Sequence, residues 1–181
     1  WADLLAGFFY LCWVPVPLGY ALYLWAKGRS KACARFSIAF LWINLFGFAL
    51  YYVHPAAPPW YVLKYGFEAR FDTPGSVAGL IRFDNMMPFP VFGNIYSGNS
   101  NVFAAVPSLH SAYVLVAAIY AVINKSHKIT ALCFFIITAG IWWTAVYTCH
   151  HYVIDVLLGI LTAFVGVAIL ELGFLRIPFI K

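Results

Sequence analysis

The 181-residue sequence is 64% hydrophobic and only 9% charged, and its mean hydropathy is +0.86. A soluble domain is roughly 45–50% apolar and about 25% charged, so this composition excludes an ordinary soluble protein and indicates an integral membrane protein. The formal net charge is +5, but the basic residues stand in short loops between apolar runs, a pattern that sets membrane orientation and argues against nucleic-acid binding.

Five apolar runs are predicted to cross the membrane as helices, since a span needs about 20 apolar residues. These predicted spans are residues 4–26, 33–53, 106–123, 129–148 and 152–174. The sequence begins at Trp1 rather than at an initiator Met, so we expect a preceding portion that adds a sixth span. The sequence thus predicts an all-α, polytopic transmembrane helix bundle, with residues 1–181 forming a single integral-membrane domain.

The one long connection, residues 54–105, is rich in Pro, Gly and Asn. A connection of this length is usually either functional or disordered. Its aromatic side chains argue against disorder, so we expect short interfacial helices and loops that cap the bundle.

Charge predicts the orientation, because cytoplasmic loops carry the excess of Lys and Arg. Three basic segments alternate so as to share one side of the membrane, which should be the cytoplasm. They hold Lys27, Arg29, Lys31 and Arg35; Lys125 and Lys128; and Arg176 and Lys181. The opposite side holds His54, His110, His150 and His151, so the possible chemistry gathers at the non-cytoplasmic face.

Asp155 is predicted to lie inside a span, where an ionisable residue is costly and suggests a functional site. It follows His151 by four residues, a spacing that puts both on one face of a helix. A carboxylate that accepts one imidazole N–H fixes the tautomer and leaves the other nitrogen free as base or nucleophile. The alternative is that the two side chains merely satisfy each other within the bundle.

A second candidate element, Pro107-Ser108-Leu109-His110, opens the third predicted span. Proline suits the first turn of a helix, and the unpaired N–H groups there can bind an anion. Ser108 and Leu109 are therefore predicted to hold a phosphate, with His110 beside it. The alternative is a helix cap with an interfacial histidine. The shared side of His110 and His151 favours the functional interpretation.

The remaining polar residues carry weaker signals. His150 is expected to face away from the reacting centre, because only His151 has Asp155 four residues on, and we keep it as a candidate for substrate binding. His54 is a candidate for lining the pocket. The four cysteines, Cys12, Cys33, Cys133 and Cys149, lack ligand spacing, so neither a disulfide framework nor a metal site is predicted.

These motifs resemble a known family. Pro107-Ser108-x-His110 and His151-x-x-x-Asp155 resemble the second and third signatures of the type-2 phosphatidic acid phosphatase superfamily. Segments 105–111 and 142–152 resemble more specifically its inositol phosphorylceramide synthase branch. The same branch is matched by Pro58-Pro59-Trp60-Tyr61, Tyr65-Gly66 and Gly79-Leu80-x-Arg82-x-Asp84. The resemblance covers most of the chain from His54 to Gly159.

The resemblance implies a six-helix bundle and catalysis without a metal or other cofactor. It assigns His151 as the nucleophile, Asp155 as its orienting partner and His110 as the acid and base. The chain departs from the broad phosphatase pattern, since Thr144 and Ala145 stand where that pattern has Ser-Arg. The Lys and Arg-Pro pair of the first signature have no convincing counterpart.

Fewer cations suit a singly charged lipid phosphodiester better than a phosphomonoester, although Arg82, Arg70, Lys64 or His54 could supply positive charge from the long loop. The resemblance to the synthase branch then implies a transferase that moves a phosphorylated headgroup, phosphoinositol above all, from a glycerophospholipid to ceramide. The alternatives are a lipid phosphatase that uses water and a non-catalytic transporter or channel. Against transport, no other span is expected to carry a buried charge that would continue a pathway, except Glu171 near the far end. The expected partners are membrane lipids, and the oligomeric state is left open.

Overall fold

The computed structural model describes residues 1–98 and 101–176, and in these residues all regular secondary structure is helical. The predicted all-α class is confirmed. The helices are α1 (Ala2–Leu11), α2 (Pro15–Ala26), α3 (Ser30–Val53), α4 (Pro59–Tyr65), η1 (Ala78–Leu80), α5 (Ile81–Asp84), α6 (Val91–Tyr96), α7 (Leu109–Ile123), α8 (Lys128–Tyr147), α9 (Val153–Leu172) and η2 (Phe174–Arg176).

Three of these helices, α3, α8 and α9, are long and apolar enough to cross a membrane. Helices α1 and α2 qualify only as a pair that bends by 44°, and α7 is a shorter apolar helix of 15 residues. The polytopic bundle is confirmed, but the five predicted runs are not five equal spans.

The bend between α1 and α2 has a visible cause. Pro15 occupies the first position of α2, and Pro17 follows two residues later. Proline has no N–H to continue the hydrogen bonding of α1, and its fixed φ suits a helix start. The predicted run 4–26 therefore forms two helices rather than one, with Trp13 in the break between them.

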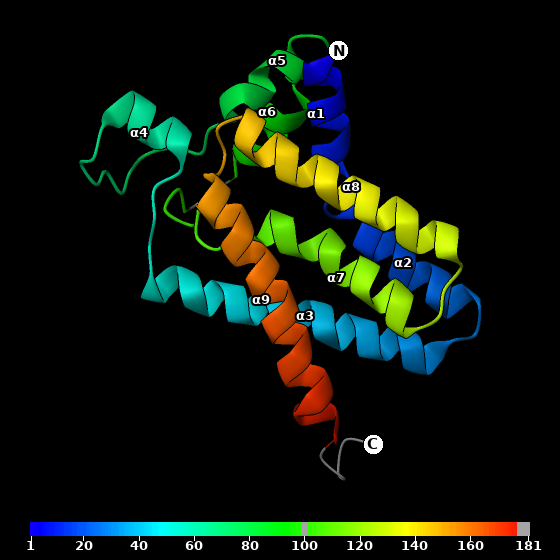
Figure 1. Ribbon diagram of the computed structural model, residues 1–181. Coiled ribbons are helices and arrows are strands. Elements are labelled where there is room, and N and C mark those ends of the chain that lie inside the picture. Colours follow the sequence, from blue (N-terminus) through cyan, green and yellow to red (C-terminus); the bar gives the residue numbers. More distant parts are fainter. Residues whose placement is uncertain (99–100, 177–181) are drawn as a thin grey trace.

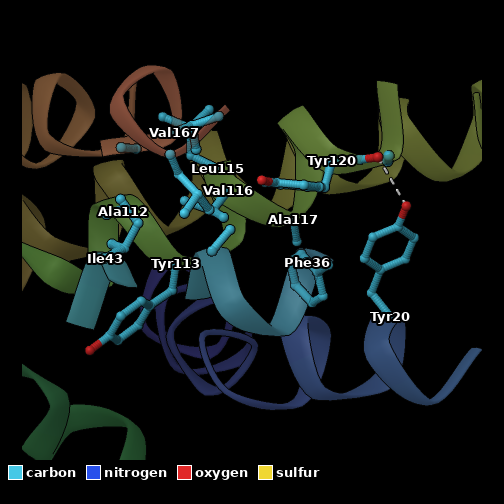
Figure 2. Close-up of a cluster of buried hydrophobic side chains, with 14 of the residues drawn as sticks. Tyr20, Phe36, Ile43, Ala112, Tyr113, Leu115, Val116, Ala117, Tyr120 and Val167 are labelled. Carbon is cyan, nitrogen blue, oxygen red and sulfur yellow. Dashed lines mark hydrogen bonds between the residues drawn. The ribbon is translucent and has the colours of Figure 1, made fainter. Parts of the chain in front are cut away.

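Helix α7 lies in the middle of the bundle and packs against α2, α3, α8 and α9 (Figure 1). Eleven of its fifteen residues are buried, as expected for a helix that is apolar on all sides. Figure 2 shows the surrounding core, in which the Tyr20 hydroxyl donates to the Tyr120 carbonyl at 3.1 Å.

The long connection folds into short helices, as predicted, and these make a second apolar cluster with α1 and the nearby ends of α8 and α9. This cluster includes Tyr10, Leu80, Phe83 and Phe92. The buried carboxylate of Asp84 accepts the N–H groups of Phe92 and Gly93 at 2.9 and 2.8 Å. It thereby caps α6 and fixes it against α5.

Two of the predicted basic segments, at the loops between α2 and α3 and between α7 and α8, lie together at one end of the bundle, opposite the long connection (Figure 1). The Arg29 guanidinium donates to the Asn124 carbonyl. Glu171 pairs with Arg35 and accepts the Tyr120 hydroxyl, so this charge is neutralised locally. Lys181 lies outside the described residues.

Candidate active site

The two neighbouring histidines stand in the turn that joins α8 to α9. Helix α8 ends in a Schellman motif: the N–H of His150 donates to the Ala145 carbonyl and that of Cys149 to the Val146 carbonyl, both at 3.1 Å. Cys149 adopts the left-handed conformation, φ 58°, that this motif requires. The turn reverses the chain, so both histidines precede the first turn of α9.

His151 is buried, and its Nδ1 lies 3.0 Å from the Ala105 carbonyl oxygen. A carbonyl can only accept, so Nδ1 carries the hydrogen and Nε2 of the neutral ring keeps a free lone pair. An oxygen of Asp155 lies 3.5 Å from the same Nδ1 and accepts the Tyr152 N–H at 2.8 Å.

This geometry corrects the expectation that His151 and Asp155 share a helix face. His151 precedes α9 and Asp155 lies in its first turn, yet the two side chains still meet. The nearer acceptor for the imidazole is the Ala105 carbonyl, a group that sequence patterns do not reveal.

The Ala105 carbonyl is held in place by a short pairing between two parts of the long connection. Ala56 and Ala104 form an isolated parallel bridge. The Ala56 N–H donates to the Phe103 carbonyl at 2.8 Å, and the Ala105 N–H donates to the Ala56 carbonyl at 3.3 Å. The segment before α7 is therefore tied to the chain that leaves α3.

His110 is the second residue of α7, and its ring centroid lies 5.7 Å from that of His151. It stacks on Tyr10 at 4.8 Å and meets the edge of Trp13 at 4.9 Å. The break between α1 and α2 thus brings Trp13 to the site. The structure brings the three predicted catalytic residues together.

A cavity of about 170 Å³ opens beside the three histidines. No Lys or Arg lines it in the part of the chain that the structure describes. Tyr10, Tyr51 and Tyr96 line it, and sequence patterns do not single them out, because tyrosine is common near membrane interfaces. The lining is Tyr10, Tyr51, Pro58, Trp60, Ser76, Tyr96, Asn101, Val102, Ala104, Ala105, His110, His150 and His151.

His150 lines this cavity too, which corrects the expectation that it faces away from the reacting centre. Its ring lies 5.4 Å from Tyr10 and 5.1 Å from Tyr96. Tyr10 therefore stands between His150 and His110 and contacts both rings.

Two predicted phosphate-binding residues take other places. Ser108 is fully buried, and its hydroxyl accepts the Ser111 N–H at 3.4 Å as the N-cap of α7. Leu109 is buried in the main core. Neither residue lines the cavity, because Ser108 caps the N-terminus of α7 and Leu109 packs into the core of the bundle.

The basic candidates from the long connection also lie outside the cavity. Arg82 pairs with Asp3 at 2.6 Å, and this hydrogen bond raises the pKa of the guanidinium. Lys64 stands over the Tyr65 ring at 5.1 Å. His54 lines a separate apolar groove of about 310 Å³ between α3 and α9.

Comparison with known proteins places this arrangement in a family. The model of the PAP2 superfamily matches residues 1–169. The chain belongs to the PAP2 superfamily. The paired motifs that carry the resemblance in the sequence are thus those of the family, and the geometry above is that of a PAP2 protein.

Relatives of this PAP2 protein include lipid synthases. It is 55% identical over 176 residues to the phosphoinositol dihydroceramide synthase of Bacteroides thetaiotaomicron, covering 97% of this chain and 58% of that protein. It is 35% identical over 125 residues to the inositol phosphorylceramide synthase catalytic subunit of Saccharomyces cerevisiae, covering 68% of this chain and 31% of that one. The chain therefore spans little more than half of the first relative. No solved structure matches it.

Proposed function

We propose that this PAP2 protein transfers a phosphoinositol headgroup from a glycerophospholipid to ceramide or dihydroceramide through a phosphohistidine. One observation carries the proposal: the Nδ1–H of His151 is held by a carbonyl, so its Nε2 lone pair is free beside His110 in the same cavity. The printed names of the relatives supply the substrate class.

In the first step, Nε2 of His151 attacks phosphorus and the bond from phosphorus to the diacylglycerol oxygen breaks. His110 first takes up a proton and then gives it to that oxygen, and diacylglycerol leaves. Asp155, 3.5 Å from Nδ1, stabilises the positive charge that develops on the ring.

In the second step, neutral His110 takes the proton of the acceptor hydroxyl while its oxygen attacks phosphorus. The bond from phosphorus to nitrogen breaks, and His151 returns to its starting form. Both half-reactions use the same two imidazoles, so His110 ends the cycle protonated and ready for the next donor.

The cavity suits a phosphodiester headgroup. A diester carries one negative charge, and no Lys or Arg lines the cavity among the described residues. Its volume of about 170 Å³ is below the roughly 300–1,000 Å³ of pockets that enclose a whole small ligand. A cavity of this size leaves the acyl chains outside, and apolar helix faces such as the groove between α3 and α9 are available to them.

We place this site at the non-cytoplasmic face of the membrane. The support is charge: Arg29 and Lys125 belong to loops at the opposite end of the bundle from the histidines, and basic loops are retained in the cytoplasm.

The test is incubation of purified protein with phosphatidylinositol labelled in its headgroup phosphate, with and without ceramide. We expect the label to move to a new lipid only when ceramide is present. Label released to water in both samples would make the protein a hydrolase, and a label that stays on the donor would remove the proposed reaction.

A further inference from the structure

The nucleophile and the acid-base histidine leave one imidazole of the cavity unused. His150 is 5% exposed, and its Nε2 has no hydrogen-bond partner among the described residues. A buried polar atom without a partner is costly, and it is rare enough in folded proteins to need an explanation.

The hydrogen bonds around Thr148 determine the tautomer of His150. The Thr148 Oγ1 lies 2.7 Å from the Thr144 carbonyl, which can only accept, so the single hydroxyl hydrogen is donated there. The same Oγ1 lies 3.0 Å from His150 Nδ1. It must accept in that contact, and therefore Nδ1 carries the imidazole hydrogen.

The ring stays neutral in this environment. Burial is the main cause that lowers the pKa of His150, to about 3, and the neighbouring His151 adds to it, outweighing hydrogen bonding to the backbone of Ser76 and Thr148. The Ser76 carbonyl can only accept, so it supplies no donor to Nε2 in this tautomer. A neutral imidazole has one N–H, so Nε2 is a lone-pair acceptor. The Tyr96 hydroxyl is not its donor, since it donates to the Tyr10 hydroxyl at 3.4 Å.

We propose that His150 Nε2 accepts a hydrogen bond from a hydroxyl of the polyol headgroup and so selects phosphoinositol over headgroups without hydroxyls. The inference rests on the proposed function for the identity of the headgroup. A phosphodiester oxygen cannot satisfy Nε2, because both atoms present lone pairs. The bound molecule must supply a hydrogen-bond donor.

The surroundings favour the headgroup over the acceptor lipid as the source of that donor. Most residues that line the cavity belong to the long connection, among them Ser76 and Trp60. The Tyr10 and Tyr96 rings flank His150 at 5.4 and 5.1 Å. In the proposed complex these rings pack against the C–H faces of a polyol ring while a hydroxyl on its edge reaches Nε2.

Three substitutions separate the acceptor from the bulk of the side chain. His150→Gln can put an amide oxygen near the position of Nε2. His150→Asn carries the same amide one methylene shorter, at the level of Nδ1, and serves as the matched control. His150→Phe keeps a ring and removes both nitrogens. Thermal unfolding in detergent checks that each variant is folded.

The donors are phosphatidylinositols that each lack one ring hydroxyl. In the wild type, kcat/KM should fall about 10- to 100-fold for one of these lipids, as expected when a buried hydrogen-bond acceptor loses its hydrogen-bond donor. In His150→Phe the complete donor should lose a similar factor, and removal of that hydroxyl should cost nothing more. His150→Gln should restore most of the discrimination and His150→Asn should not.

Equal losses for every deoxy donor in wild type and His150→Phe would overturn the inference. It would also fail if the variants responded to methylation of the ceramide hydroxyls or amide rather than to changes in the headgroup. A merely structural role of His150 would lower turnover of all donors by one factor and leave their ratios unchanged.

A binding measurement keeps this inference separate from the proposed function. Calorimetry compares methyl phosphoinositol with methyl phosphocholine, two diesters without acyl chains. Should the protein transfer nothing from phosphatidylinositol, the proposed function fails. A preference for the inositol diester that is lost in His150→Phe and kept in His150→Gln would still support the acceptor role, whereas equal binding of both diesters would refute it.

Discussion

His150 and His151 are neighbours with the same tautomer but different surroundings. Each presents Nδ1–H to a fixed acceptor, the Thr148 hydroxyl for one and the Ala105 carbonyl for the other. Nε2 of each ring therefore keeps a lone pair that the contact at Nδ1 leaves free. Only His151 has a carboxylate beside it and His110 opposite, so only it has the charge compensation that a nucleophile needs.

Asp155→Asn should keep the fold and reduce turnover by about 10- to 100-fold. The loss is expected to be smaller than the roughly 10⁴-fold known where a carboxylate alone fixes the tautomer of a catalytic histidine, because the Ala105 carbonyl still holds Nδ1–H. Steady-state transfer assays measure it. Normal turnover in the folded variant would show that the contact between His151 and Asp155 is purely structural.

His110→Ala and His151→Ala should respond differently to a donor with a nitrophenol leaving group. Such a group departs without a proton, so the first step should recover in His110→Ala. The second step still lacks its base, and coloured product should stop after about one equivalent, as with a stalled covalent intermediate. His151→Ala should stay inactive with every donor. Equal inactivity of both variants, or label on His110, would reverse the roles.

The sequence predicts the side chains of this site better than the groups that hold them in position. His110, His151 and Asp155 follow from motif spacing, and the structure places them together. The Ala105 carbonyl could not be predicted, since a backbone group leaves no mark on residue type. The prediction for Ser108 conflicts with its place in the structure because a serine that starts a helix can bind either a ligand or its own backbone, and here it accepts from Ser111.

At the scale of the elements, the ends of helices position the chemistry. The Schellman motif after α8 sets both histidines, and the Trp60 N–H donates to the Cys149 carbonyl at 3.0 Å, which ties α4 to the same turn. The break before α2 was predictable from Pro15 and Pro17, since a proline inside an apolar run ends or bends the helix before it. Hydropathy alone predicted one span where the structure has two helices, α1 and α2.

Cys149→Gly should stabilise the protein by about 0.5–1 kcal/mol. Cys149 has φ 58°, a conformation that costs a side-chain-bearing residue about 1–2 kcal/mol, partly offset by the greater freedom of glycine in the unfolded chain. Thermal unfolding in detergent measures the change. Cys149→Ala is the control, because it keeps Cβ and removes only the thiol. A glycine variant no more stable than the alanine variant would contradict this account of the turn.

At the scale of the whole molecule, two apolar clusters divide the chain. The main core surrounds α7, and the smaller cluster joins α1 to α5 and α6. Hydropathy predicted the number of apolar runs but not their roles, since a run buried by protein and a run facing lipid have the same composition. Helix α7 is a run buried by protein. Its 15 residues are apolar because the helices around it bury them, and this arrangement is visible in the structure but not in the sequence.

The proposed orientation predicts the labelling of introduced cysteines. In a cysteine-free background, Gly98→Cys should react with an impermeant reagent added outside intact cells, since it lies in the long connection. Ser126→Cys, in the basic loop between α7 and α8, should react only after the cells are opened. The opposite pattern would put the histidines on the cytoplasmic face.

Transfer should persist in the presence of a strong chelator, since imidazoles alone supply the nucleophile, acid and base in the proposed reaction. Headgroup transfer is measured before and after dialysis against the chelator, with an unrelated zinc enzyme as a positive control for metal removal. Activity lost on dialysis and recovered with added zinc or magnesium would replace this chemistry with a metal-assisted one.

The length of α7 bears on how deep in the membrane the proposed reaction would occur. Fifteen residues rise about 22 Å, whereas the hydrocarbon layer is about 30 Å thick. In the proposed orientation the contact of Arg29 with Asn124 holds the far end of α7 at the cytoplasmic surface, and an upright α7 would then place His110 several ångströms beneath the opposite surface. Water is scarce at that depth, while a sphingoid alcohol already resides near it. In the proposed reaction, the short central helix would thus favour a lipid alcohol over water as the acceptor of the phosphoryl group before any specific contact is made.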